Sequence, residues 1–215
     1  MGIVENLYIC GRKIHTILIH SLFKLICFMK KLLSILAAAI LAFGNATMAE
    51  NLNFEGVVGM NVANINVSDF NSRIGFHIGV RGTYAFQSPD QGLYANAGAL
   101  LSLKGAKLED VTFNPYYLEI PIHMGYKYSI TDAVGIFGEF GPYFGIGLFG
   151  KTEGVDVFSD EVGYKRFDVG LGLRAGFEFA KKASVSIGYD FGLTDIADEA
   201  NAQNRNFSIS LGYKF

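Results

Sequence analysis

The chain has 215 residues, and its composition combines 50% hydrophobic residues and 26 glycines with only 18% charged residues. Its 18 basic and 20 acidic residues give a net charge of −2 and form no basic cluster, which excludes an electrostatic surface for nucleic acid. The two cysteines, Cys10 and Cys27, stand near the N-terminus, so the rest of the chain offers no thiol for a disulfide, a thiolate metal site or a cysteine nucleophile.

Residues 29–49 have the pattern of a secretory signal peptide. Met29-Lys30-Lys31 supplies a basic start, residues 32–43 carry no charge, and the small Ala49 precedes the expected cleavage. The apolar run is too short to cross a membrane as a helix. We predict that residues 1–28 are an over-long start of the reading frame, with an internal signal anchor as the alternative. The mature domain would be residues 50–215, with 13 basic and 19 acidic residues and a net charge of −6.

From residue 53 onward, large apolar residues recur at every second position in eight segments. Strict alternation indicates a strand with one apolar and one polar face, and about ten residues let a tilted strand cross a bilayer. Eight is also the smallest strand number common among outer-membrane barrels. The sequence therefore predicts an all-β fold, an eight-stranded antiparallel up-and-down transmembrane β-barrel over residues 50–215. The segments lie near residues 54–62, 74–86, 93–103, 116–128, 134–148, 167–179, 185–193 and 207–215.

The positions that alternate with the apolar ones, which we call the polar phase, distinguish a membrane barrel from a soluble one. A soluble ligand-binding barrel also alternates, but its polar phase faces water and should be rich in Lys, Glu and Thr. Here glycine dominates that phase, for example at Gly141, Gly145, Gly170 and Gly172. This pattern favours a cramped interior inside a lipid-facing wall.

Connection lengths predict how the barrel is oriented. Residues 87–92, 129–133 and 180–183 are short connections, and short turns face the periplasm in such barrels. Residues 65–73, 105–114, 152–165 and 194–205 would then be outward loops, and both termini would be periplasmic. These loops are acidic, which indicates a solvated surface or, as an alternative, a site for divalent cations or basic partners. Their acidic residues are Asp69, Glu109, Asp110, Glu153, Asp156, Asp160, Glu161, Asp195, Asp198 and Glu199.

Charged residues in the polar phase predict a charge network inside the barrel. An eight-stranded barrel has an interior just wide enough for side chains to fill, and unpaired buried carboxylates would cost several kcal/mol each. We expect the two signs to pair and close the lumen, with a narrow polar or proton-conducting path as the alternative. The predicted network consists of Glu55, Arg81, Lys104, Glu119, Lys127, Glu139, Asp168, Arg174, Glu178 and Asp190, to which Lys214 adds a further cation.

Two histidines, His77 and His123, share that phase. Together with Glu119 they could form a metal or acid–base set, but they lack helical metal-ligand spacing, and hydrogen-bonded interior histidines are the favoured interpretation. We predict no catalytic residues, no metal and no cofactor. The protein would then not be an enzyme.

The last ten residues alternate strictly and end in Tyr213-Lys214-Phe215. A strand that ends on a terminal aromatic residue resembles the signal by which bacterial outer-membrane barrels are recognised for assembly. We therefore predict Tyr213 and Phe215 as an assembly signal. The expected partners are the barrel assembly machinery and the lipid of the outer membrane.

The segment Tyr117-Leu-Glu-Ile-Pro-Ile-His-Met-Gly-Tyr-Lys-Tyr128 resembles the fourth strand of the PorT-like outer-membrane barrels of Bacteroidetes. Residues 167–179 and 189–196 fit later strands of the same family. The resemblance implies the barrel fold, the outer membrane and a possible link to secretion-system proteins. We expect a surface or envelope-assembly component, with a narrow porin-like channel as the alternative and an outer-membrane enzyme as a third reading.

Overall fold

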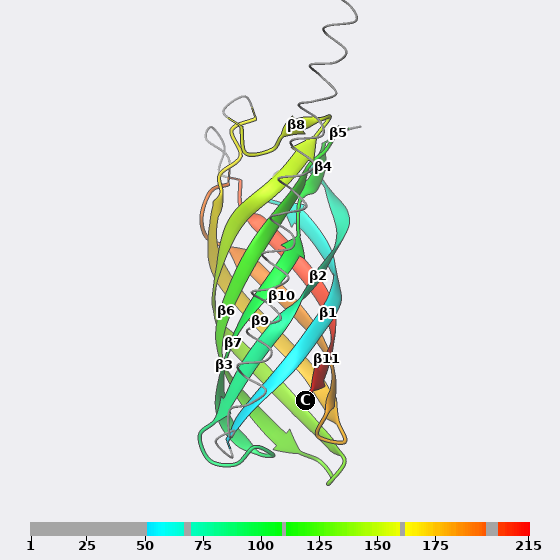
Figure 1. The fold of residues 1–215 in the computed structure, drawn as a ribbon, viewed down its shortest axis with the longest axis vertical. Coiled ribbons are helices and arrows are strands. Elements are labelled where there is room, and N and C mark those ends of the chain that lie inside the picture. The colour runs from blue at the N-terminus through cyan, green and yellow to red at the C-terminus, as the bar shows by residue number, and fades with distance from the viewer. Residues whose placement is uncertain (1–50, 67–69, 109–110, 160–161, 197–201) are drawn as a thin grey trace, which may run out of the picture. The chain divides into compact units, whose positions relative to one another are not determined.

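The computed structural model describes residues 51–66, 70–108, 111–159, 162–196 and 202–215. In these ranges the regular structure is entirely β (Figure 1). No helix in the described ranges is long and apolar enough to span a membrane. The predicted start segment 1–28 and the predicted signal peptide 29–49 lie outside the described residues.

Eight strands of ten or more residues form the wall of the barrel. Three short strands lie in the connections between them: β4 (Ala106–Leu108), β5 (Val111–Thr112) and β8 (Val155–Asp156). The eight long strands are β1 (Leu52–Ile65), β2 (Phe70–Ala85), β3 (Gly92–Leu103), β6 (Asn114–Ser129), β7 (Val134–Thr152), β9 (Phe167–Phe179), β10 (Ala183–Gly192) and β11 (Asn204–Lys214).

Each long strand pairs in antiparallel fashion with the next long strand along the chain. The first and last strands also pair, from Glu55 opposite Lys214 to Ile65 opposite Asn204. This pairing closes the sheet, so neither strand presents a free edge along this seam. The predicted eight-stranded antiparallel up-and-down barrel is confirmed.

The two ends of the barrel differ in their connections. Residues 86–91, 130–133 and 180–182 form short turns at one end, where the C-terminus also lies (Figure 1). We call this the turn end, and the opposite end, where three of the four connections are longer and the three short strands lie, the loop end. The predicted connections are correct to within a few residues, but β2 already begins at Phe70, so Arg73 belongs to a strand and not to a loop.

Side chains alternate between the outer face and the lumen. On β1, Val58 is 50% and Met60 58% exposed, whereas the preceding Val57 and the following Asn61 are buried. This period of two fixes the register, because a slip by one residue would exchange the two faces. Leu103 is an exception, since it was predicted on the apolar outer face and is buried at the loop end. Nearby, a register shift between Tyr116 and Tyr117 interrupts the β6–β7 pairing.

Inward-facing glycines make room for large side chains opposite them. A Cβ on Gly125 would lie 2.7 Å from Cε2 of Tyr94, and one on Gly172 would lie 2.8 Å from Nε2 of His123. Real Cβ atoms do not approach other side chains so closely. The excess of glycine in the polar phase is therefore what allows Tyr94 and His123 to fit inside a narrow barrel.

Candidate functional site

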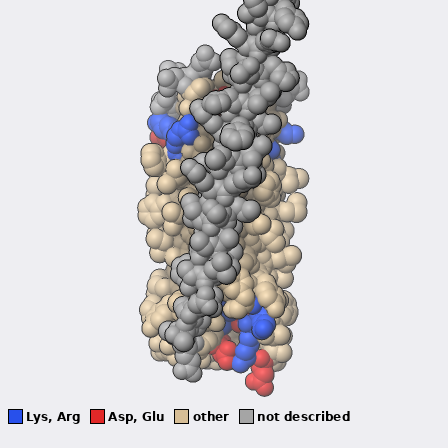
Figure 2. Space-filling model, viewed as in Figure 1, with Lys and Arg blue, Asp and Glu red and all other residues tan. Residues whose placement is uncertain are grey.

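The candidate site is the lumen, where the structure places the ten predicted charged residues. Nine of them are buried and Asp190 is half-buried. By contrast, on the visible part of the outer face the middle of the barrel carries no charged side chains, and Lys, Arg, Asp and Glu lie toward the two ends (Figure 2). The charge inside the barrel is thus separated from the outer face by the wall.

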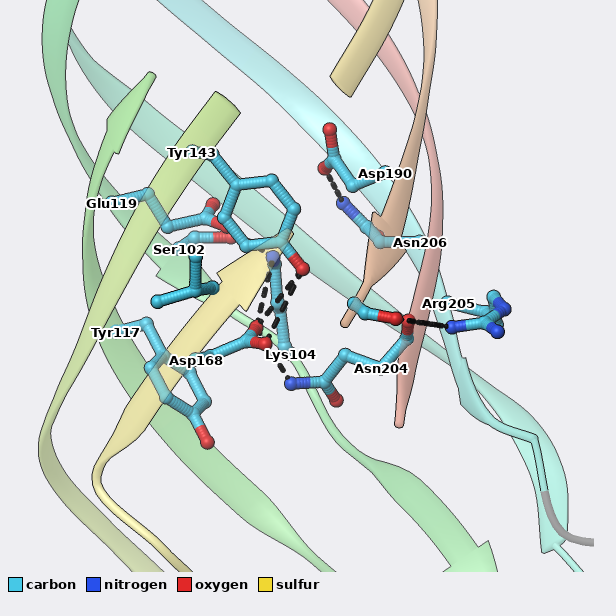
Figure 3. Close-up of polar contacts among 12 residues, drawn as sticks. Ser102, Lys104, Tyr117, Glu119, Tyr143, Asp168, Asp190, Asn204, Arg205 and Asn206 are labelled. Atoms are coloured by element: carbon cyan, nitrogen blue, oxygen red, sulfur yellow. Dashed lines mark hydrogen bonds and ion pairs between the residues drawn. The ribbon is translucent and has the colours of Figure 1, made fainter. Parts of the chain in front are cut away.

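Lys104 is the centre of the group nearest the loop end. It directly follows β3, only 1% of its surface is exposed, and its ammonium contacts the carboxylate of Glu119. The same nitrogen lies 3.9 Å from Oδ2 of Asp168 and 4.5 Å from the ring centroid of Tyr143. Figure 3 shows these side chains converging from different strands. One enclosed cation is therefore shared by two carboxylates and an aromatic face.

Asp168 is completely buried and is held by two further donors. The hydroxyl of Tyr143 lies 3.2 Å from Oδ2 and 3.4 Å from Oδ1, and Asn204 Nδ2 donates to Oδ2 over 2.8 Å (Figure 3). Charge-assisted hydrogen bonds of this kind are the stronger ones. They join β7, β9 and β11 across the lumen.

His77 belongs to a second group that joins the first and last strands. Its Nδ1 lies 2.7 Å from Oδ1 of Asn61, and its Nε2 lies 2.9 Å from the hydroxyl of Ser210. Asn61 Nδ2 in turn donates to Ser102 over 2.9 Å. This arrangement suits a neutral imidazole that donates from Nδ1 and accepts at Nε2.

Glu139 forms the centre of a third group, in the middle of the lumen. The hydroxyl of Tyr94 donates to Oε1 over 3.0 Å, and Nη1 of Arg174 donates to Oε2 over 3.1 Å. His123 lies beside them, with its Nδ1 3.5 Å from Oε2. Both oxygens of this buried carboxylate therefore have a partner.

Glu178 is the central carboxylate of a fourth group, at the turn end of the lumen. Lys127 donates to Oε1 over 3.0 Å, and Lys214 contacts Oε2. Glu55 contacts the hydroxyl of Ser184. Glu55, Lys127, Glu178 and Lys214 line a pocket whose wall also includes Tyr94, Phe137 and the turn residues Ser88 and Pro89.

The predicted charges thus form separate groups and not one continuous network. Among the described residues, Arg81 and Asp190 make no ion pair within 4.0 Å, although Asp190 accepts a hydrogen bond from Asn206 over 3.0 Å. Strand tilt and register determine which side chains reach one another across the lumen, and neither can be read from the sequence alone.

The sequence analysis did not identify the uncharged partners of these charges, although all of them occupy inward-facing positions. These partners are Asn61, Tyr94, Ser102, Tyr143, Ser184, Asn204, Asn206 and Ser210.

The metal or acid–base set, the less favoured interpretation of His77, His123 and Glu119, does not come together. Glu119 is held by Lys104, His77 by Asn61 and Ser210, and His123 lies beside Glu139. Within the ranges described, no group of three or more His, Cys, Asp or Glu side chains could hold a metal ion.

An apolar cluster covers the loop end of the lumen. Its members come from three of the four loop-end connections and from β1 and β6, and Tyr117, Val157 and Ile196 are fully buried in it. Phe158 packs edge-to-face on Tyr117 at 6.0 Å and on Tyr164 at 6.1 Å between ring centroids. Burial raises the pKa of the Tyr164 phenol, so this ring stays neutral. We call this cluster the cap; it comprises Ile65, Ala106, Tyr117, Val157, Phe158, Val162, Tyr164, Ile196 and Ala202.

The structure describes three of the ten predicted acidic loop residues. Glu153 and Asp156 are exposed, and Asp195 is half-buried. Asp69, Glu109, Asp110, Asp160, Glu161, Asp198 and Glu199 lie outside the described residues.

A protein-family model described as "Outer membrane protein beta-barrel domain" matches residues 35–215. The chain belongs to this outer-membrane β-barrel family. No curated protein matches the sequence.

Several solved outer-membrane barrels resemble this one in fold. Neisserial surface protein A is 18% identical with a TM-score of 0.51, covering 75% of this chain and 97% of that protein. The attachment invasion locus protein Ail of Yersinia pestis is 15% identical with a TM-score of 0.44, covering 78% and 100%. OprG of Pseudomonas aeruginosa is 15% identical with a TM-score of 0.44, covering 77% and 96%. At these identities the likeness concerns the fold alone.

As an outer-membrane barrel, the protein presents its exposed apolar residues to lipid. Aromatic pairs stand near both ends of this surface: Tyr84 and Phe86 at the turn end, and Tyr116 stacked on Phe149 at the loop end. Such rings suit the membrane interface. Tyr213 and Phe215, predicted as the assembly signal, are 56% and 67% exposed. Recognition by the barrel assembly machinery stays a prediction.

Proposed function

We propose that this outer-membrane barrel is a closed surface or envelope-assembly component that acts through its loop end. One observation carries the proposal: the loop end is closed twice, by the cap and by the buried Lys104 group beneath it. A polar pocket opens at the turn end, but a conducting path would have to cross both layers. A lumen filled in this way supports a structural role and not a channel.

Conductance across a planar bilayer tests the closed lumen. The refolded, heat-modifiable barrel of residues 50–215 should give no single-channel steps at any salt concentration. Reproducible steps that change when Glu139 is replaced by Gln would overturn the proposal in favour of the narrow channel.

The same proposal places the short turns and both termini in the periplasm and the loops outside. The contrast in connection length supports this orientation. Because residues 50–215 contain no cysteine, Gly154→Cys and Thr131→Cys each introduce a single label site. A membrane-impermeant maleimide should label Gly154→Cys in intact cells, and Thr131→Cys only after the outer membrane is permeabilised. The reverse pattern would contradict the orientation.

A link to protein secretion is the finer part of the proposal, and the PorT-like segment at residues 117–128 supports it. Cross-linking in intact cells, followed by purification of the barrel, should recover secretion components in near-stoichiometric amounts. Recovery of the barrel alone would point instead to a stand-alone surface protein.

We further propose that the barrel works without catalysis. His77 has both ring nitrogens engaged, and His123 is 2% exposed inside the wall. Neither histidine side chain faces the lipid. Purified barrel incubated with outer-membrane lipids should leave their mass spectrum unchanged, whereas a new product that disappears in the His123→Ala variant would reveal an enzyme.

A further inference from the structure

Arg81 and Arg174 stand out in the middle of the lumen because both are buried and close together. They are 4% and 8% exposed. Arg174, Glu139 and Glu55 are all close enough to Arg81 for their charges to act on it. Two like charges in a poorly hydrated interior repel each other, so the pair needs more negative charge nearby than an isolated arginine does.

The carboxylates near the two arginines leave several of their N–H donors without a partner. Glu139 accepts from Arg174 and Tyr94, and Glu55, although opposite Arg81 in the β1–β2 pairing, turns to Ser184 on β10. As a result, Nε and Nη2 of Arg81 and Nε of Arg174 are buried and have no hydrogen-bond partner among the described residues. A buried donor without a partner costs about 1–3 kcal/mol, and more when it is charged.

The turn-end pocket lies close to the pair, and glycines pack against both arginines. A Cβ on Gly98 would lie 2.8 Å from Cγ of Arg81, and one on Gly188 would lie 3.7 Å from Nε of Arg174. Arg81 is also two residues deeper along the inward face of β2 than Thr83, which lines the turn-end pocket together with Glu55, Tyr94 and Glu139. The pocket therefore reaches Glu139, the carboxylate to which Arg174 donates.

We propose that Arg81 and Arg174 bind a small monovalent anion of the halide class, which reaches them through the turn-end pocket. A halide accepts several N–H donors at once and would satisfy the unpartnered donors of the two arginines. A multiply charged or larger anion is disfavoured, because the carboxylates of Glu139 and Glu55 lie beside the site. The inference concerns the interior alone and does not depend on the proposed surface function.

Bromide is the direct probe of this site. Crystals of the refolded barrel grown in sodium bromide should show an anomalous scattering peak between the guanidinium groups of Arg81 and Arg174. Ordinary water density at that place, with bromide peaks only on the protein surface, would overturn the proposal. This measurement uses the unaltered protein, so it decides even if a variant fails to fold.

The second test compares two lumen cations. The temperature at which half of the barrel loses its folded mobility on gels, here called the midpoint, should rise as bromide replaces isethionate at constant ionic strength. In Arg81→Met the apparent bromide dissociation constant should increase about tenfold or more, as expected from the loss of charge-assisted hydrogen bonds. Lys104→Met removes a lumen cation outside the turn-end pocket; it should lower the midpoint but keep the bromide dependence. An identical bromide response in all three proteins, or none in the unaltered barrel, would contradict halide binding at the arginines.

Discussion

Lys104 illustrates at the scale of one residue what a buried charge requires in this lumen. It has two carboxylates and an aromatic ring around it, and almost none of its surface is exposed. Attraction in the interior offsets the cost of removing the ions from water only when such partners are present. The members of the Lys104 group therefore stabilise one another, and removal of Lys104 leaves two buried carboxylates without their cation.

Replacement of Lys104 by Met should lower the free energy of unfolding by about 3–5 kcal/mol, because Glu119 and Asp168 would remain buried without their cation. Urea titration of the barrel in lipid vesicles, followed by heat-modifiable mobility on gels, measures the change. Lys181→Met is the matched control, since Lys181 pairs with Asp90 at the exposed turn end. Equal stability of both variants would show that the buried group contributes nothing.

Tyr143→Phe tests the neutral part of the same group. The ring and its contact with Lys104 remain, but the hydroxyl that donates to Asp168 is lost. We expect a loss of about 1–3 kcal/mol, smaller than for Lys104→Met, because a charged acceptor loses one donor and keeps Asn204. The same urea titration measures it, and a loss as large as that of Lys104→Met would contradict this division of roles.

At the scale of elements, the turn between β9 and β10 carries backbone strain. Ala180 and Lys181 have φ angles of 49° and 59°, the left-handed region that suits glycine. Two consecutive residues in this conformation match the twist of a two-stranded hairpin, which explains why the turn adopts it in spite of the cost.

Ala180→Gly should raise the stability of the barrel by up to about 1 kcal/mol, because glycine adopts this φ without the Cβ clash. Urea titration in vesicles measures the gain. Ala133→Gly, in another short turn but without a positive φ, is the control and should give no gain. A loss of stability in Ala180→Gly would mean that the strain is absent.

The cap is an element of the loop end that can be weakened separately. Ile196→Ala removes a fully buried side chain from it, and such changes cost about 2–5 kcal/mol where the site is well packed. Limited proteolysis should then cut the loop-end connections faster, while the urea midpoint of the strands changes little. Loss of the heat-modifiable band at room temperature would instead show that the cap and the wall unfold together.

For the molecule as a whole, the outer face must match the depth of the bilayer. Ile209, midway along β11, and Leu193, beyond the loop end of β10, are 50% and 59% exposed. Ile209→Arg should cost about 2–4 kcal/mol and Leu193→Arg only about 0–1 kcal/mol, because a charge is tolerated near the interface but not in the hydrocarbon. Unfolding titrations in vesicles distinguish the two, and equal costs would show that the barrel sits at a different depth.

The sequence predicted the wall of the molecule well and its interior only in part. The eight strands follow from alternation, because each strand has one face toward lipid and one toward the lumen. The inward placement of Lys104 and Glu139 follows from the same phase, but their partners depend on strand tilt and register. The cap could not be predicted, because Val157, Tyr164 and Ile196 lie in connections without any periodic pattern. The buried Leu103 shows the same limit at a strand end.

The seam between β1 and β11 also constrains how the protein is made. Residues 52–65 are among the first of the described chain to be synthesised and residues 204–214 among the last, yet they pair along their length. Contacts so distant in sequence form slowly, and until they form the sheet has two unpaired edges that invite aggregation. The ring can close only once the final strand has been delivered. Export must therefore keep the polypeptide unfolded and protected over its full length, and insertion into the membrane becomes a late and concerted event.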